Sequence, residues 1–234
     1  MTDNTYHPLP TLIAPELLER AARLSPALLC DGMNDTGIPR NGCLDAALCP
    51  VDDNKVLLGT ACTVDTAGGD NFPVHTAIYQ GQPGYVLVIA GKADTERAYL
   101  GDLLAGAAQA TGINGIIVDG NVRDKTALAA LEMPVYARGF MPRGPLKAQR
   151  GQINIPVQCA GITVHPGDLV FGDADGVVVV PQERLEEVLE KAEQKLAYET
   201  ERRRAIAAYQ LARETGQPLP ELAPAWVKAL MNEG

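Results

Sequence analysis

Hydrophobic and polar positions in the first quarter of the chain follow patterns typical of short helices and a strand. Residues 15–30 carry apolar side chains at helical spacing, and Ser25-Pro26 predicts that a second short helix begins there. Residues 36–55 are rich in turn-forming residues and predict a loop with one short strand. From residue 56, the segment VLLGTACTVDT alternates with the period of a β-strand.

The middle of the chain alternates between short apolar runs and helical segments. The apolar runs predict a strand after the Pro-Gly turn within 83–91, and further strands at 115–120 and 134–139. The segments between them predict helices at 102–112 and 125–132. Strands that alternate with helices in this way predict a parallel sheet with helical crossovers, so the fold class is α/β.

After residue 150, short apolar runs separated by the turns HPGD and DADG predict antiparallel or mixed strand pairing. Pro181 then begins a long charged helix that we expect to run to about Tyr209. Residues 219–231 form either a final short helix or an extended tail. Linkers, repeats and low-complexity stretches are absent from the sequence, which predicts a single domain.

Composition and charge narrow the classes of protein that fit this pattern. Apolar residues make up 46% of the 234, too many for a disordered chain. The net charge of -9 argues against nucleic-acid binding and against a polybasic membrane anchor. No apolar run approaches the roughly 18 residues of a membrane span. The five cysteines form no CxxC pair and the start MTDNTYHPLP is not a signal peptide, so we expect a reduced, cytoplasmic protein.

The predicted helix over 102–112 begins with a pattern that suits an anionic ligand. Its opening residues are Gly101, Asp102, Leu103 and Leu104. The first amides of a helix have no intrahelical acceptor and lie at the positive end of the dipole, so they bind carboxylates and phosphates. Asp102 alone is equally well explained as a simple helix cap.

A second candidate element follows the strand at 115–120. The loop after it places Arg123 and Asp124 side by side, and loops after the carboxyl ends of parallel strands gather ligands. Arg binds keto oxygens and carboxylates through its fork of donors, whereas a carboxylate can hold one hydrated Mg²⁺. The alternative is a surface ion pair between Arg123 and either Asp124 or Asp119.

Together, GDLLA and DGNVRD resemble the RraA-like family. Within it they are similar to the class II pyruvate aldolases that cleave 4-hydroxy-4-methyl-2-oxoglutarate and 4-carboxy-4-hydroxy-2-oxoadipate. Three further segments fit, namely GGDNFPVHTAI, QPGYVLVIAG and NIPVQCAGITVHPGDLVFGDADGVVVVP. The resemblance covers about residues 25–205. It implies an α/β/β/α sandwich around a parallel or mixed sheet, one domain over 1–234 and a C-terminal helical tail over 206–234.

The resemblance also implies how the substrate binds. Arg123 is expected to hold the C2 keto oxygen of the pyruvyl group, and Lys147 to lie near the site. The pyruvyl carboxylate is expected to bind the backbone amides of Gly101, Asp102, Leu103 and Leu104.

The remaining implied roles are catalytic. Asp124 is expected to hold the divalent metal, Mg²⁺ or Mn²⁺, and Asp102 to orient a metal-bound water that moves the proton. Glu199 is expected to reach in from a neighbouring subunit, which implies a homotrimer or homohexamer. From the pattern alone, Glu199 either lies past the buried stripe of its helix or faces a site.

The implied activity is a metal-dependent lyase that cleaves a 4-hydroxy-2-oxo acid to pyruvate and a second carbonyl compound, as in the degradation of aromatic compounds. Oxaloacetate decarboxylation would use the same enolate. Two alternatives remain: a non-catalytic RraA-like regulator that binds a ribonuclease, and a lyase or hydrolase of the same fold acting on a non-pyruvyl acid. Lys92, Glu96 and Arg97 precede the GDLLA motif, where we expect groups that select the substrate.

Several polar residues are weaker candidates. His75 is either a pocket residue or a core histidine, and Asp70 with Asn71 is positioned to add polar groups to the cleft. Asp168, Asp173 and Asp175 are interpreted as turn formers, because the spacing of the Gly and the final Glu does not match an EF-hand. His165 precedes Pro-Gly-Asp and is interpreted as a turn residue.

Overall fold

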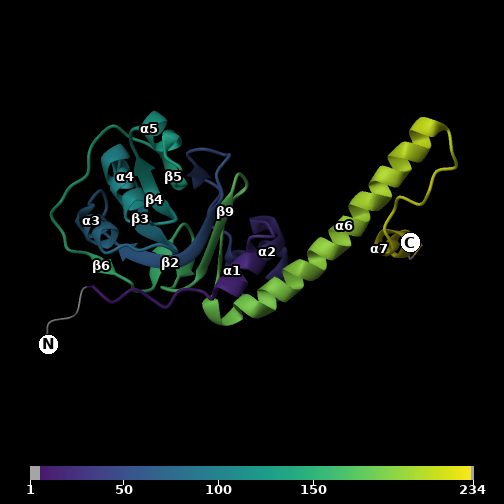
Figure 1. Cartoon of the computed structure of the whole chain (residues 1–234), viewed down its shortest axis with the longest axis horizontal. Coiled ribbons are helices and arrows are strands. Elements are labelled where there is room, and N and C mark those ends of the chain that lie inside the picture. The colour runs from purple at the N-terminus through teal and green to yellow at the C-terminus, as the bar shows by residue number, and fades with distance from the viewer. Residues whose placement is uncertain (1–5, 233–234) are drawn as a thin grey trace.

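A mixed eight-stranded sheet forms the body of the protein in the computed structural model, which describes residues 6–232 (Figure 1). Four adjacent strands run parallel: β2 (Leu57–Asp65), β3 (Tyr85–Ala98), β4 (Gly115–Val122) and β5 (Val135–Phe140). This confirms the parallel sheet expected from the alternation of strands and helices.

Antiparallel strands extend the parallel core on both sides. At one edge β1 (Cys49–Pro50) pairs with β5. On the other side β9 (Leu169–Asp173) pairs with β2, and β10 (Gly176–Val180) pairs with β9. The short strand β6 (Gln152–Ile153) pairs with the end of β2. The mixed pairing expected after residue 150 is therefore confirmed.

Alternate side chains of β3 face opposite sides of the sheet, and each side is covered by a different layer. Leu87 and Ile89 pack in the cluster beneath the crossover helices α3 (Phe72–Tyr79), α4 (Asp102–Ala110) and α5 (Lys125–Ala130). Val86 and Val88 face the opposite side. There they pack in the cluster that includes the hairpin of β7 (Val157–Cys159) and β8 (Ile162–Val164). A strand buried on both faces is a continuous apolar run, which is the pattern of YVLVIA.

Three helices form a further layer against β9 and β10. They are α1 (Pro15–Ala21), α2 (Pro26–Gly32) and α6 (Leu185–Thr215). The hydroxyl of Ser25 accepts a hydrogen bond from the Leu28 amide at 3.2 Å and caps α2, as the Ser-Pro pair predicted.

Helix α6 packs on this layer only near its start and then extends away from the body (Figure 1). A Cβ on Gly32 would lie 2.7 Å from the carbonyl oxygen of Val188, so glycine allows α2 to cross α6 closely. Helix α7 (Ala225–Asn232) returns beside the outer part of α6, where the Trp226 indole donates to the Tyr198 hydroxyl at 3.3 Å. No described helix has the length and low charge needed to cross a membrane.

Several elements differ from the sequence expectations in their presence or in their ends. Helix α3 was not predicted, and its start depends on a carboxylate cap from Asp70 that periodicity does not reveal. A 3₁₀ turn, η2 (Gln182–Arg184), precedes α6, which continues beyond Tyr209 to Thr215. Strand β3 continues past residue 91 to Ala98 through an irregular stretch of pairing with β4. A second 3₁₀ turn, η1 (Pro39–Gly42), lies in the loop before β1.

Candidate active site

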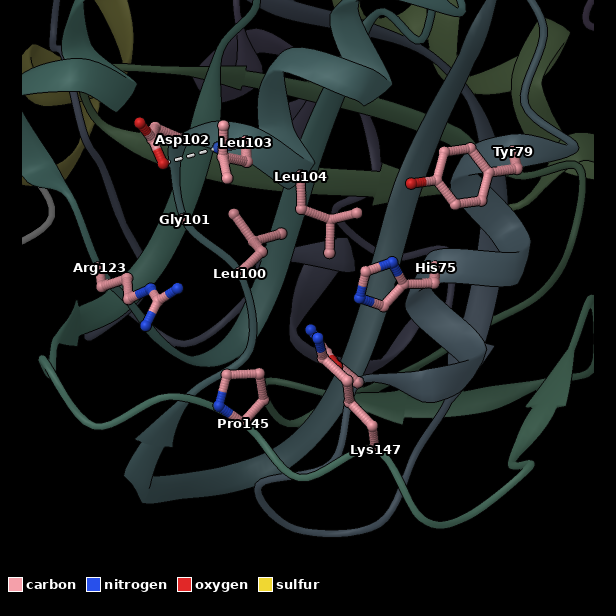
Figure 2. Close-up of a pocket in the computed structure, with 11 residues that line it drawn as sticks. His75, Tyr79, Leu100, Gly101, Asp102, Leu103, Leu104, Arg123, Pro145 and Lys147 are labelled. Carbon is pink, nitrogen blue, oxygen red and sulfur yellow. Dashed lines mark hydrogen bonds between the residues drawn. The ribbon is translucent and has the colours of Figure 1, made fainter.

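A cavity of about 300 Å³ opens between the N-terminus of α4, helix α3 and the loop that follows β5 (Figure 2). Figure 2 shows Arg123 and Asp102 on one side of it, with His75 and Tyr79 on the other. The cavity lies beyond the carboxyl ends of the parallel strands, where α/β sheets bind their ligands. Six of the eight residues predicted for the site line it: Gly101, Asp102, Leu103, Leu104, Arg123 and Lys147.

The first turn of α4 forms one wall of the cavity. Gly101 is its N-terminal flanking residue, in an extended conformation, and it supplies no side-chain cap. The amide of Asp102 donates to Asp124 Oδ2 at 3.2 Å, and the amide of Leu103 donates to Asp102 Oδ1 at 2.7 Å. Two protein carboxylates therefore contact the helix N-terminus, the position expected to bind an anionic substrate group.

The β4–α5 turn brings Arg123 and Asp124 against this helix start. The Arg123 amide donates to the Leu100 carbonyl at 3.0 Å, which links the two loops. Asp124 adopts a left-handed conformation with φ of 62° and does not itself line the cavity. Its Oδ2 lies 3.6 Å from Arg123 Nε. The ion pair considered from the sequence is therefore present, at the edge of the cavity.

Gly101 is required by this arrangement. A Cβ at that position would lie 2.1 Å from Asp124 Oδ2 and 2.9 Å from Arg123 Cγ. No neighbouring backbone atom is among its nearest contacts, so the constraint comes from the two side chains of the site. Glycine at residue 101 lets the helix N-terminus, the guanidinium and the carboxylate approach one another.

The opposite wall comes from α3 and from the loop after β5. His75 faces the cavity, and partial burial followed by the nearby charge of Lys147 lowers its pKa. Asn71 is 2% exposed and donates through Nδ2 to the Tyr99 carbonyl at 2.7 Å. Its Oδ1 has no hydrogen-bond partner among the described residues. His75 and Asn71 are only weak candidates in the sequence, and Tyr79, Leu100 and Pro145, which also line the cavity, carry no motif that marks them.

Asp70 holds this wall together and does not line the cavity. It is 1% exposed, and Oδ1 accepts from the Phe72 amide at the start of α3 at 2.9 Å. Its Oδ2 accepts from the amides of Ala148 and Gln149 at 2.7 and 3.1 Å. The carboxylate thereby ties α3 to the loop that carries Lys147, and the expectation that Asp70 adds a polar group to the cleft is wrong.

Replacing Asp70 with alanine should destabilise the protein. The change removes the charged acceptor of three half-buried hydrogen bonds from backbone amides, and hydrogen bonds to charged groups contribute about 1.5–3 kcal/mol each. We expect the free energy of unfolding in urea to fall by about 3 kcal/mol. The control is Asp173→Ala, which removes a single bond to the Asp175 amide in an open turn and should have a smaller effect. Equal losses in the two variants would contradict the role assigned to Asp70.

Three charged residues before the GDLLA motif form their contacts outside the cavity, two of them with the loop after β5. Arg97 donates to the Gly144 carbonyl at 2.8 Å, Glu96 lies 3.4 Å from Arg143, and Lys92 pairs with Asp65 at 3.2 Å. None of Lys92, Glu96 and Arg97 lines the cavity. These residues therefore lie outside the site. The irregular end of β3 directs the segment that carries them toward the loop after β5.

Glu199 lies on α6 and does not contribute to the cavity of its own chain. Its carboxylate pairs with Arg203 on the next helical turn at 2.6 Å. This part of the helix extends away from the sheet (Figure 1). A role for Glu199 in the site of a neighbouring subunit stays a prediction.

The donor set near α4 fits a hydrated hard cation. Within residues 6–232 no three His, Cys, Asp or Glu side chains come together as a metal cluster. Mg²⁺ usually keeps several waters and needs only one or two protein carboxylates. The half-exposed carboxylate of Asp124, beside the exposed Asp102, meets that requirement.

The turn residues after residue 150 have the structural roles expected of them. Asp168 is buried and accepts from the His165 and Gln182 amides at 2.8 and 3.3 Å, while burial raises its pKa. Asp173 accepts from the Asp175 amide at 2.9 Å. These residues close the turns around β9 and lie outside the candidate site.

Similarity to known structures covers most of the fold. A solved structure of an uncharacterized protein from Pseudomonas syringae pv. tomato has a TM-score of 0.71 and 30% identity, over 89% of this chain and 97% of that one. The structure of Streptomyces coelicolor RraAS2, described as an unusual member of the RNase ES inhibitor RraA protein family, has a TM-score of 0.73 and 27% identity. That match covers 81% of this chain and 98% of the other.

Sequence similarity identifies the family. A protein of Halalkalibacterium halodurans named "Putative 4-hydroxy-4-methyl-2-oxoglutarate aldolase" is 43% identical over 164 residues, which are 70% of this chain and 78% of that protein. The RraA-like family, described as Aldolase/RraA, matches residues 26–179. Because this match spans more than half of the sequence and includes both GDLLA and DGNVRD, the chain belongs to the RraA-like family.

Proposed function

We propose that this protein is a divalent-metal-dependent pyruvate aldolase of the class II type. It would cleave a 4-hydroxy-2-oxo acid to pyruvate and a second carbonyl compound, and would decarboxylate oxaloacetate as a side activity. The observation that carries the proposal is that a helix N-terminus, a guanidinium and two carboxylates meet around Gly101 at the edge of the cavity. The aldolase name of the Halalkalibacterium relative supports the same reaction.

Substrate binding follows from the charges on this wall. The pyruvyl carboxylate would bind the first amides of α4, between Gly101 and Leu104, because the helix dipole favours an anion there. Arg123 would then donate to the C2 keto oxygen. The carboxylates that contact those amides in the structure would release them to the substrate.

Bond cleavage places negative charge on the oxygen that Arg123 holds. Removal of the proton from the C4 hydroxyl breaks the C3–C4 bond, and the electron pair moves to the C2 oxygen to form the enolate of pyruvate. A guanidinium aimed at the developing charge stabilises it, which is commonly the largest single contribution to such catalysis. A Mg²⁺ or Mn²⁺ ion held by Asp124 and water would add Lewis-acid stabilisation of the same charge. Loss of CO₂ from oxaloacetate produces the same enolate.

Proton transfer is assigned to Asp102 acting through water. Its Oδ1 accepts from the Leu103 amide, and its side chain is exposed at the mouth of the cavity, where Oδ2 can orient a water. That water would accept the C4 hydroxyl proton during cleavage and would then give a proton to C3 of the enolate, which yields pyruvate. Glu199 of a second copy would assist at the mouth of the cavity, in a homotrimer or in two stacked trimers.

One observation favours a second candidate function. The similarity to RraAS2 extends over 81% of the chain, and that protein is described as belonging to a ribonuclease inhibitor family. A non-catalytic regulator would use an outer surface and would not need the cavity chemistry. A lyase or hydrolase that acts on a non-pyruvyl acid would keep the cavity and release no pyruvate.

The decisive test measures pyruvate release with Mg²⁺ or Mn²⁺, from 4-hydroxy-4-methyl-2-oxoglutarate and from oxaloacetate. Asp124→Asn is the sharpest variant, because asparagine keeps the size of the side chain and tolerates the left-handed backbone at φ of 62°. We expect it to reduce pyruvate release at least 100-fold, by analogy with the loss of an electrostatic catalytic group. Titration should also show weaker Mn²⁺ binding.

The matched control is Asp175→Asn, an exposed carboxylate in the turn between β9 and β10. It should retain full activity and Mn²⁺ affinity. A wild-type protein that releases no pyruvate from either substrate with either metal would overturn the aldolase proposal. Ribonuclease inhibition by that inactive protein would then support the regulator.

A further inference from the structure

Two cysteines far from the cavity have their sulfur atoms in contact. Cys30 lies on α2, and Cys43 follows the 3₁₀ turn η1. Cys43 Sγ donates a hydrogen bond to Cys30 Sγ at 3.1 Å, which compares with about 2.05 Å in a disulfide. The two sulfurs are therefore about 1 Å farther apart than in a disulfide.

The backbones that carry these thiols are fixed. Cys43 forms an isolated β-bridge with Val178, and the Leu44 amide donates to the Val177 carbonyl at 3.0 Å. Cys30 belongs to a helix that packs on β10 and on α6. The contact between the sulfurs is thus maintained by the sheet and by the helix layer.

The pair is accessible and lies beside a positive charge. A cavity of about 350 Å³ is lined by both cysteines together with Arg40 and Asp45. Burial, followed by the contact with Cys30, raises the pKa of the Cys43 thiol to about 12. The Cys43 thiol donates to Cys30 Sγ at 3.1 Å and has a longer contact with the Asn41 carbonyl at 3.7 Å. Accessible thiols in such surroundings are the ones that react with oxidants.

We propose that Cys30 and Cys43 form a reversible dithiol–disulfide pair that is oxidised by hydroperoxides. The Cys30 thiolate attacks the terminal oxygen of the hydroperoxide, the O–O bond breaks, and a sulfenic acid and an alcohol result. Cys43 sulfur then attacks the sulfenic sulfur, the S–S bond forms, and water leaves with the Cys43 proton. Two thiols and one hydroperoxide thereby give one disulfide, one alcohol and one water.

The disulfide would join helix α2, which packs on α6, to the residue that follows η1. The two cysteines are 13 positions apart, and the loop between them contains η1. Closing this loop restricts the unfolded chain, so oxidation should raise the midpoint of urea unfolding. The pair does not line the cavity of Figure 2, and its oxidation is independent of the proposed reaction.

Hydrogen peroxide treatment of the full-length chain tests the proposal. Trypsin releases Cys30 in the peptide 24–40 and releases Cys43 together with Cys49 in the peptide 41–55. The test therefore uses Cys49→Ser, which retains four cysteines and removes the ambiguity. We expect a mass loss of two hydrogen atoms, a linked pair of these peptides, a fall from four thiols to two in denaturant, and reversal by dithiothreitol.

Two further variants identify the order of the steps. In Cys43→Ser within the Cys49→Ser background, dimedone should trap a sulfenic acid on Cys30, and no linked peptides should form. In Cys30→Ser, Cys43 should remain unreacted at the same peroxide dose. Disulfide-linked dimers in place of the internal bond, or retention of all four thiols at doses that oxidise Met33 in the same peptide, would overturn the proposal.

Discussion

Replacing Arg123 with alanine is expected to lower kcat for pyruvate release by about 10²–10³-fold, the loss typical when one group that stabilises developing negative charge is removed. Arg123 lies beside the α4 N-terminus, with Nε 3.6 Å from Asp124 Oδ2, and it is the arginine that lines the cavity. Loss of the guanidinium should reduce kcat more than it raises KM, because the helix amides still bind the substrate carboxylate.

Folding stability should be nearly unchanged in this variant. The side chains of Arg123 and Asp124 are 44% and 39% exposed, and exposed ion pairs contribute little. We expect the free energy of unfolding to stay within about 0.5 kcal/mol of wild type. Arg123→Lys tests the geometry further, because lysine keeps the charge but lacks the fork of donors, and its kcat should lie between wild type and alanine.

Arg143→Ala is the matched control for Arg123→Ala. Arg143 belongs to the same end of the sheet, where it lies 3.4 Å from Glu96, but it does not line the cavity. Steady-state kinetics with oxaloacetate and unfolding in urea measure all three variants. Equal kcat in Arg123→Ala and Arg143→Ala would remove Arg123 from the chemistry.

The parts of the fold that depend on local patterns were predictable from the sequence. Continuous apolar runs such as YVLVIA and GIIV identify strands buried on both faces, and the helices between them require parallel pairing. The three strands β3, β4 and β5 and the two helices between them begin within a few residues of their expected starts, although β3 extends to Ala98. The family resemblance, carried by GDLLA and DGNVRD, supplied the layers that periodicity does not encode and is confirmed by the match over 26–179.

The second wall of the cavity could not be predicted because it depends on long-range contacts. Asp70 and Ala148 are separated by 78 positions, and one carboxylate joins them. Helix α3 has only eight residues, so its periodicity is weak, although Pro73 in its first turn is a recognisable start signal. The position of His75 opposite Arg123 follows from these contacts and from no local motif.

Backbone geometry also explains why Lys92, Glu96 and Arg97 lie outside the cavity. Lys92 and Ala93 both have positive φ, which interrupts the pairing of β3 with β4. The segment that follows therefore contacts the loop after β5 from behind, through Arg97 and Glu96. A single chain also cannot show which residues a second copy contributes, so Glu199 remains a prediction.

Gly101→Ala is expected to abolish most activity while leaving the fold intact. The added Cβ would lie 2.1 Å from Asp124 Oδ2 and 3.1 Å from Arg123 Nε, so both side chains must move. A displacement of about 1 Å at a catalytic group can cost about 100-fold in rate, and we expect at least that loss in kcat/KM. Because the Gly101 backbone is extended, alanine adds no backbone strain, and the melting temperature should change little.

Gly106→Ala provides the control on the same helix. A Cβ at Gly106 would meet no atom within 4 Å, and replacing glycine inside a helix stabilises by about 0.5–1 kcal/mol. This variant should therefore retain full activity with equal or higher stability. The opposite pattern, an active Gly101→Ala enzyme, would show that the close approach of Asp124 and Arg123 to the α4 N-terminus is not needed for catalysis. Loss of both activity and stability in Gly101→Ala would instead assign Gly101 to folding, so kinetics and thermal unfolding must be measured on the same preparation.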